Sequence, residues 1–424
     1  MTLPHSSAPI AWTPVEIDAA WAAAKRRFLV PETEGLADFL GADGFAGLPT
    51  PDEVQRAFPD RHGYGTGQED GMIHAGAMLD ALAARTEAAE CGAAPPAPWA
   101  APDAAALVRG VARCCFAHGR PGFLARSVCR DDPSLCYPAT SRDQITMAAF
   151  GLWRLLRSPL AAAAPAAVAT ARRILAAMAD FLLATVREET GWEAPTLDGA
   201  PDPLHRCVLW GDAVLPHEAA RLPMVFAAAF AATGEARFAA VRDRFAAEAL
   251  RRSAAPLASG TPTYALLQMQ ASLALLAAEV PALAPDVAPI LARVAALCVP
   301  RQAAAAAKAL AADHAQPAPD WRAAGGLKGP YRETWAALRE VGEAAVARQL
   351  AGPLPDGDAA TLAVVLRHAD PDRCTGCGLF HLIEALWRGF CQAEKGRRRS
   401  GRALPSWPMP TPHTIARSGA VISL

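Results

Sequence analysis

Three segments of the sequence gather acids, arginines and aromatic rings around turn-forming residues. The first, GYGTGQEDG at residues 63–71, places Tyr64 shortly before the adjacent acids Glu69 and Asp70. Glycines let a backbone approach a ligand closely, and free N–H groups at a helix start favour carboxylates or bind an anion. We expect Tyr64 to stack on substrate and the two acids to be candidate catalytic groups. A glycine-rich turn with ordinary first-turn acids is the alternative.

The second segment is GFLARSVCRDDPSLCYPATSRDQITMAAFGLW, residues 122–153. Arg126 and Arg142 can each hold a carboxylate through two parallel hydrogen bonds, and Tyr137 can stack or donate. Asp143 is expected at a helix mouth, where apolar neighbours would raise its pKa enough for acid chemistry near neutral pH. The alternative is a first-turn charge paired with Arg142 or Arg126.

The third segment is LWGDAVLPHEAARLPM, residues 209–224. Trp210 supplies an aromatic wall, and His217 and Glu218 are expected in the first turn of a helix. An ion pair between Glu218 and Arg221, three residues apart on one helix, is the structural alternative. A solvated His217 is an equally good interpretation of that histidine.

Carboxylates from separate segments suit the cleavage of a glycosidic bond. One acid protonates the leaving oxygen, and a second carboxylate acts as base or nucleophile across the sugar ring. Asp143 together with Asp70 or Glu69 would supply this pair, with Glu218 as a further candidate. Aromatic faces combined with arginine forks suit a sugar that bears a carboxylate. This chemistry requires no metal and no other cofactor.

Cys374 and Cys377 form a CxxC motif that is followed by His381 and Cys391. The spacing invites comparison with a zinc site. There is no second CxxC nearby, however, and the segment continues as an apolar helix, so core thiols are favoured. Zinc binding and redox chemistry stay as alternatives.

Apolar residues recur at helical spacing along most of the chain. Thr13, Pro14 and Glu16 form a start signal with a capping box, and a later helix is expected to start at Pro216 and to kink at Pro223. Helices are expected near residues 14–29, 72–82, 103–118, 144–156, 166–186, 218–233, 235–252, 263–276, 289–298, 303–313, 331–350, 359–368 and 379–394.

Runs of alternating β-branched residues are almost missing, so the fold class is predicted to be all-α. Glycine and proline sit mostly between the helices, and no long polar linker divides the chain. We therefore expect a single domain over residues 1–424, with 395–424 as an extended C-terminal tail. Paired antiparallel helices favour an (α/α)6 toroid. An open solenoid is the rival, although no fixed-period repeat supports it.

The chain has 424 residues, of which 52% are hydrophobic, and its 41 basic and 42 acidic residues leave a net charge of -1. This balance gives no general attraction to nucleic acid or to an anionic membrane. The basic run at 395–402 is expected to be solvated. No transmembrane helix and no secretory signal are predicted. Ten scattered cysteines fit reduced thiols, so we expect a cytoplasmic protein.

The segment SRDQITMAAFGLW, residues 141–153, resembles the six-hairpin glycosidase superfamily, the (α/α)6 toroids that include unsaturated glucuronyl and rhamnogalacturonyl hydrolases. The resemblance implies a catalytic Asp before a helix whose Met and Leu residues face the barrel core. It gives the acid and base role to Asp143, with Asp70 as a possible second carboxylate. Arg142 stands where the unsaturated glucuronyl hydrolases have a second Asp, so ordinary uronide hydrolysis is at least as well favoured as vinyl-ether hydration.

These observations favour a glycoside hydrolase that acts on a uronic-acid-containing oligosaccharide. A polysaccharide lyase is the second possibility, in which Tyr137 or His217 removes a proton beside a carboxylate neutralised by Arg126 or Arg142. The third is a noncatalytic helical scaffold that binds a sugar or a protein. The sequence leaves the exact sugar and the oligomeric state open.

Overall fold

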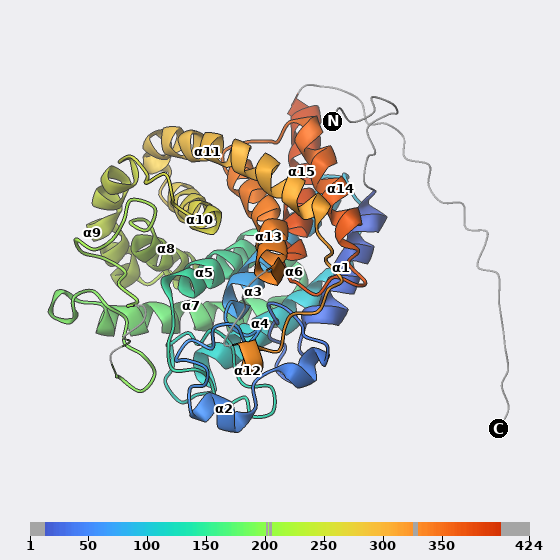
Figure 1. Cartoon of the computed structure of the whole chain (residues 1–424). Coiled ribbons are helices and arrows are strands. Elements are labelled where there is room, and N and C mark those ends of the chain that lie inside the picture. The colour runs from blue at the N-terminus through green and yellow to red at the C-terminus, as the bar shows by residue number, and fades with distance from the viewer. Residues whose placement is uncertain (1–12, 201, 203–205, 325–329, 400–424) are drawn as a thin grey trace.

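The computed structural model describes residues 13–200, 202, 206–324 and 330–399. These residues form fifteen α-helices and three short 3-10 helices. Their extended segments meet only in isolated bridges, such as the one between Leu29 and Leu36. The all-α prediction is confirmed (Figure 1).

The α-helices are α1 (Pro14–Phe28), α2 (Pro51–Gln55), α3 (Gly71–Glu90), α4 (Ala100–Phe116), α5 (Arg142–Arg157), α6 (Leu160–Ala163), α7 (Pro165–Thr185), α8 (Arg221–Thr233), α9 (Ala236–Ser253), α10 (Thr263–Glu279), α11 (Ala284–Ala311), α12 (Trp321–Ala324), α13 (Pro330–Gln349), α14 (Asp356–Ala369) and α15 (Leu379–Arg399). The 3-10 helices are Gly44–Gly47, Glu188–Thr190 and Pro281–Leu283.

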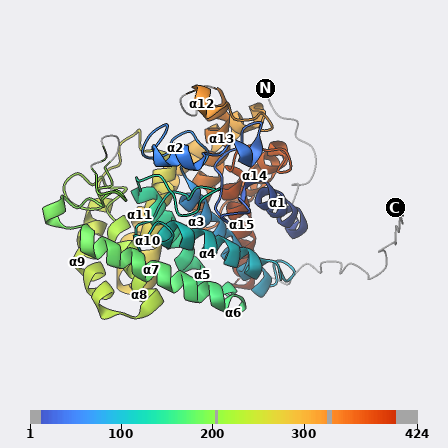
Figure 2. The same ribbon diagram turned by 90° about the horizontal axis from the view of Figure 1, so that it is seen from below.

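The longer helices alternate along the chain between two sets. In the inner set, α3, α5, α8, α10, α13 and α15 each pack against the next, and α15 also packs against α3 (Figure 1). The outer set, α1, α4, α7, α9, α11 and α14, packs against members of the inner set. Helices α2 and α12 lie together at one end of the molecule (Figure 2), where Arg322 forms a 2.6 Å ion pair with Glu53.

Small residues allow the inner helices to approach closely. A Cβ atom added at Gly76 of α3 would lie 2.1 Å from the carbonyl oxygen of Met147 on α5. A Cβ added at Gly151 of α5 would lie 2.4 Å from the carbonyl oxygen of Gly76. The two backbones therefore touch where they cross, and α3 is buried on almost all of its faces.

Local signals predicted some helix boundaries and missed others. The capping box of Thr13 and Glu16 is confirmed. The two helices expected at 289–298 and 303–313 are one helix, α11, which runs through Pro289 and Pro300. Packing of its buried face outweighs the two backbone hydrogen bonds that the prolines remove.

The prediction that a helix starts at Pro216 was wrong. Helix α8 begins at Arg221, so Pro216 and Glu218 lie in the preceding turns. Pro223 then occupies the first helical turn, where its missing N–H has no intrahelical partner. For this reason Pro223 does not interrupt α8.

Helix α15 continues to Arg399, so the extended tail expected from Lys395 does not begin there. Residues 400–424 lie outside the described part of the chain. Among the described residues, one helical stretch, Pro281–Ala311, is long and apolar enough by length and composition to cross a membrane. Its helix α11 packs against α10, α13 and α14.

Candidate functional site

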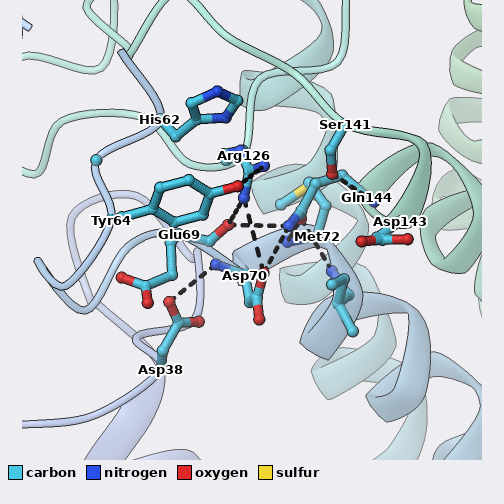
Figure 3. Close-up of polar contacts among 12 residues, drawn as sticks. Asp38, His62, Tyr64, Glu69, Asp70, Met72, Arg126, Ser141, Asp143 and Gln144 are labelled. Carbon is cyan, nitrogen blue, oxygen red and sulfur yellow. Dashed lines mark hydrogen bonds and ion pairs between the residues drawn. The ribbon is translucent and has the colours of Figure 1, made fainter. Parts of the chain in front are cut away.

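The starts of α3 and α5 bring several predicted site residues together (Figure 3), and the start of α8 adds Arg221 to them. Asp70 is the N-cap of α3. Asp143 lies in the first turn of α5, where the Ser141 hydroxyl accepts the N–H of Gln144 at 3.4 Å. Arg221, the first residue of α8, donates to the Asp143 carboxylate at 2.6 Å. Residues far apart in the sequence therefore share one end of the inner helices.

Asp70 is held by three side chains from three other segments. Gln144 donates to its Oδ1 over 3.0 Å, Arg339 donates to its Oδ2 over 2.5 Å, and the guanidinium of Arg126 lies 3.8 Å from Oδ1. Burial raises the pKa of Asp70, but the charges of Arg339 and Arg126 outweigh it and hold that pKa below its ordinary value. Asp70 is therefore a fixed carboxylate at neutral pH, with 18% of its side chain exposed.

Tyr64 and Arg126 form a second pair beside Asp70. The guanidinium lies 4.9 Å from the centre of the Tyr64 ring and donates to its hydroxyl at 3.2 Å. The ring also stacks on His62 with centroids 4.7 Å apart. Burial raises the pKa of Tyr64, and the charges of Asp70 and Asp143 add to this effect against Arg126. The phenol is therefore protonated at neutral pH.

Glu69 turns its carboxylate away from this group. Its Oε2 accepts the N–H of Gly65 at 2.6 Å, and only its backbone oxygen accepts from Arg126 and Gln144. Burial raises the pKa of Glu69 well above its ordinary value, and the nearby charges of Asp38 and Asp70 raise it further. Glu69 is thus a buried carboxylic acid, and its predicted role as a catalytic group in contact with substrate has no geometric support.

Asp143 is the more accessible of the two carboxylates, with 30% of its side chain exposed. Tyr264, at the start of α10, is 37% exposed. Burial raises the pKa of Tyr264, and the charges of Asp143 and Asp70 raise it further, while Arg221 and Arg339 oppose them. No local pattern in the sequence marks Tyr264, Gln144 or Arg339 as a site residue.

Arg142, His217 and Glu218 form an adjoining group. Arg142 lies 2.9 Å from the carboxylate of Glu218 and donates to the Val208 carbonyl at 3.2 Å. His217 Nε2 lies 3.8 Å from Glu218. Burial lowers the pKa of His217 although Glu218 opposes this, so the imidazole is neutral at pH 7.

The sequence-based alternatives predicted ion pairs for Asp143 and Glu218, but with the wrong partners. Asp143 pairs with Arg221 and not with Arg142 or Arg126. Glu218 pairs with Arg142 because it precedes α8 and lacks the helical spacing that would align it with Arg221. Both pairs join separate segments.

Two predicted binding residues lie away from this group. Tyr137 donates its hydroxyl to the Phe58 carbonyl at 2.6 Å and packs in an apolar cluster with Val54. Trp210 is only 7% exposed, with its ring 4.7 Å from that of Phe245. Core packing accounts for both aromatic residues, so neither Tyr137 nor Trp210 lies where its predicted contact with substrate would require.

A buried polar network continues behind Asp70. Arg339 Nε donates to Glu343 at 2.6 Å, and burial raises the pKa of Glu343 to about 7 against the lowering effect of Arg339. Further along, His381 lies 3.2 Å from Glu384. The charge state of Glu343 is thus coupled through one guanidinium to Asp70.

The residues around the CxxC motif do not form one metal site. Cys374 Sγ contacts the Gly376 carbonyl at 3.1 Å, His381 faces Glu384, and Cys391 faces Glu87. All ten cysteines are free, as the interpretation of reduced thiols requires.

Cys377 instead joins two residues that the sequence analysis did not connect with it. Its Sγ and the Oδ1 of Asp38 both lie 3.0 Å from Nε2 of His74. These three buried side chains make up a group that can hold a metal ion, with ligand atoms all within 4.8 Å of one another.

Comparisons of the chain with protein-family models, with curated proteins and with solved structures found no match.

Proposed function

We propose that this protein is a glycoside hydrolase that acts on an oligosaccharide containing uronic acid. The observation that carries the proposal is the position of Asp70 and Asp143 at the starts of two adjoining inner helices, with Gln144, the residue after Asp143, bonded to Asp70. Hydrolysis of an acetal requires one carboxylic acid and one carboxylate at the same site, and we assign these roles to Asp143 and Asp70.

We further propose that the inner set closes into the (α/α)6 toroid that the sequence analysis favoured. Contacts between successive inner helices support this arrangement. They run in the order α3, α5, α8, α10, α13 and α15, and α15 also contacts α3. In such a ring the starts of the inner helices face a common hollow. That hollow is where Asp70, Asp143 and Tyr264 would meet a sugar.

The two carboxylates would have different roles. We assign proton exchange with the glycosidic oxygen to Asp143, because its side chain is the more accessible of the two. Asp70 stays ionised beside Arg339 and acts as the base that activates water or as the charge that stabilises a cationic sugar. Tyr64 and Tyr264 offer faces for the sugar ring.

An anionic sugar is favoured by the arginines beside the two carboxylates. Arg126 lies 3.8 Å from Asp70, and Arg221 donates to Asp143 at 2.6 Å. Planar guanidiniums bind carboxylates through paired hydrogen bonds.

The proposal is tested by screening the full chain against saturated and unsaturated glucuronides and measuring the sugar released. Hydrolysis by the unaltered protein that is lost in Asp143→Asn supports it. Absence of release from every uronide, or full activity of Asp143→Asn, contradicts it and favours a sugar-binding scaffold.

A lyase is the second candidate, because Tyr64 contacts Arg126. In this reaction Tyr64 would remove a proton from the sugar, and Arg126 would neutralise the adjacent carboxylate of the substrate. This reaction ranks below hydrolysis because the raised pKa of Tyr64 keeps the phenol protonated. Elimination creates a conjugated double bond, so ultraviolet absorbance of the product distinguishes the two reactions.

A further inference from the structure

A buried group of three side chains lies beneath Asp70 and takes no part in the proposed hydrolysis. Asp38 comes from the loop after α1, His74 from the first turn of α3, and Cys377 from the turn before α15. All three are fully buried. Three segments that are distant in the sequence therefore present a carboxylate, an imidazole and a thiol to one another.

The geometry differs from that of a catalytic triad. Cys377 Sγ and Asp38 Oδ1 both lie 3.0 Å from the same atom, Nε2 of His74. In a nucleophile, histidine and acid triad the two partners use opposite ring nitrogens, whereas Nδ1 of His74 has no partner. The three ligand atoms instead converge on a common point.

Asp38 is held in place for this convergence. Its Oδ2 accepts the N–H of Asp70 at 2.8 Å, and its carbonyl accepts the N–H of Cys377 and the indole N–H of Trp335. Its Oδ1 makes no hydrogen bond, even though it lies so close to His74. A buried carboxylate oxygen without a hydrogen-bond donor is costly, and a cation would satisfy it.

Among the described residues, the surrounding charges offer Asp38 no arginine partner. Its neighbours at the start of α3 are Glu69, a buried neutral acid, and Asp70 (Figure 3). Two guanidiniums, of Arg126 and Arg339, face them. Both act on Asp70, which leaves the buried Asp38 without a described arginine partner.

We propose that Asp38, His74 and Cys377 bind a divalent zinc ion. Nitrogen, sulfur and oxygen donors together match zinc, whereas magnesium and calcium prefer oxygen alone. Ligand atoms at about 2.0–2.3 Å from zinc stand about 3–4 Å apart in a tetrahedron. Asp38 Oδ1 and Cys377 Sγ, each 3.0 Å from His74 Nε2, lie at the lower end of this range. The fourth position is left for a water molecule. The ion would tie the loop after α1 to the starts of α3 and α15.

The test compares two cysteines of the same CxxC motif. The full chain and the variants Cys377→Ser and Cys374→Ser are saturated with zinc, dialysed, and measured for bound metal by elemental analysis. We expect one zinc per chain in the unaltered protein and in Cys374→Ser, because Cys374 faces the Gly376 carbonyl. Cys377→Ser should lose affinity at least about tenfold.

A second measurement covers the case in which Cys377→Ser does not fold. Cobalt titrated into the unaltered protein should give a thiolate charge-transfer band that zinc abolishes, and Cys374→Ser should give the same band. Absence of bound zinc and of this band in the unaltered protein overturns the proposal, as does equal zinc binding by folded Cys377→Ser. Neither readout uses enzymatic activity, so these measurements test the zinc site independently of the proposed hydrolase function.

Discussion

The side-chain amide of Gln144 joins the start of α5 to the start of α3. Its Nε2 donates to Asp70 Oδ1 at 3.0 Å, while its Oε1 accepts the backbone N–H groups of Met72 and Ile73 at 3.0 and 3.2 Å. One side chain thus satisfies free donors of α3 and fixes Asp70 relative to the neighbouring Asp143.

Gln144→Leu should therefore lower uronide hydrolysis by about 10²-fold, since a displaced catalytic group loses its alignment. Steady-state kinetics of the folded variant measure the effect. Gln316→Leu, at an exposed position, is the matched control and should keep full activity. An unchanged rate in Gln144→Leu would show that Asp70 needs no such support.

Asp143→Asn should abolish turnover and preserve the fold. The amide can still accept from Arg221, but it cannot exchange a proton, so a loss of about 10²–10⁴-fold is expected. Product release and circular dichroism are measured together. Asp131→Asn, whose carboxylate is exposed and pairs with Arg130, should behave as the unaltered protein.

Arg339→Gln should move the acidic limb of the kcat/KM profile to higher pH. Arg339 lowers the pKa of Asp70 against the effect of burial, so its removal raises that pKa and the base form is lost earlier on acidification. A displacement of about 1–3 pH units is expected for the loss of a contacting opposite charge. Arg172→Gln, on the exposed face of α7, is the control. A limb that stays in place would assign it to a group other than Asp70.

Glu343 should make the protein less stable as pH rises. Its pKa is raised from 4.5 to about 7 in the folded state, so the folded protein binds the extra proton between these values. The stabilisation is complete below pH 4.5 and is lost as pH rises towards 7, by roughly 3 kcal/mol in total. Urea unfolding of Glu343→Gln across this range should lack the decline. Glu333→Gln, exposed on the same helix, should retain it.

Asp80→Asn should destabilise the fold by about 3–5 kcal/mol, because it leaves buried guanidiniums without their carboxylate. Asp80 is fully buried between Arg154, at 2.6 Å, and Arg388. Chemical denaturation measures the loss. Asp286→Asn, exposed on α11, is expected to change stability by less than about 0.5 kcal/mol.

Local sequence signals predicted most helices because apolar spacing and caps act within a few residues. Thr13 and Glu16 are an example, since each bonds the other's backbone. The union of two expected helices into α11 was missed because the packing that compensates Pro289 and Pro300 comes from helices elsewhere in the chain.

The residues of the candidate site, like the helices, were predicted only in part. Asp70, Arg126 and Asp143 stood out because each lies in a segment dense in polar groups, and the structure brings them together. Arg339 and Tyr264 gave no signal, because each lies in an ordinary helical pattern with no turn-forming glycines or dense polar cluster beside it. Their roles depend on which helices become neighbours.

The contact between α15 and α3 affects how the chain is made. Helix α3 emerges from the ribosome long before Phe380, Ile383 and Trp387 of α15, which are buried in the finished core. Long-range partners of this kind slow folding and leave apolar surface open to aggregation in the meantime. Newly synthesised molecules should therefore depend on chaperones until translation of the last helix is complete.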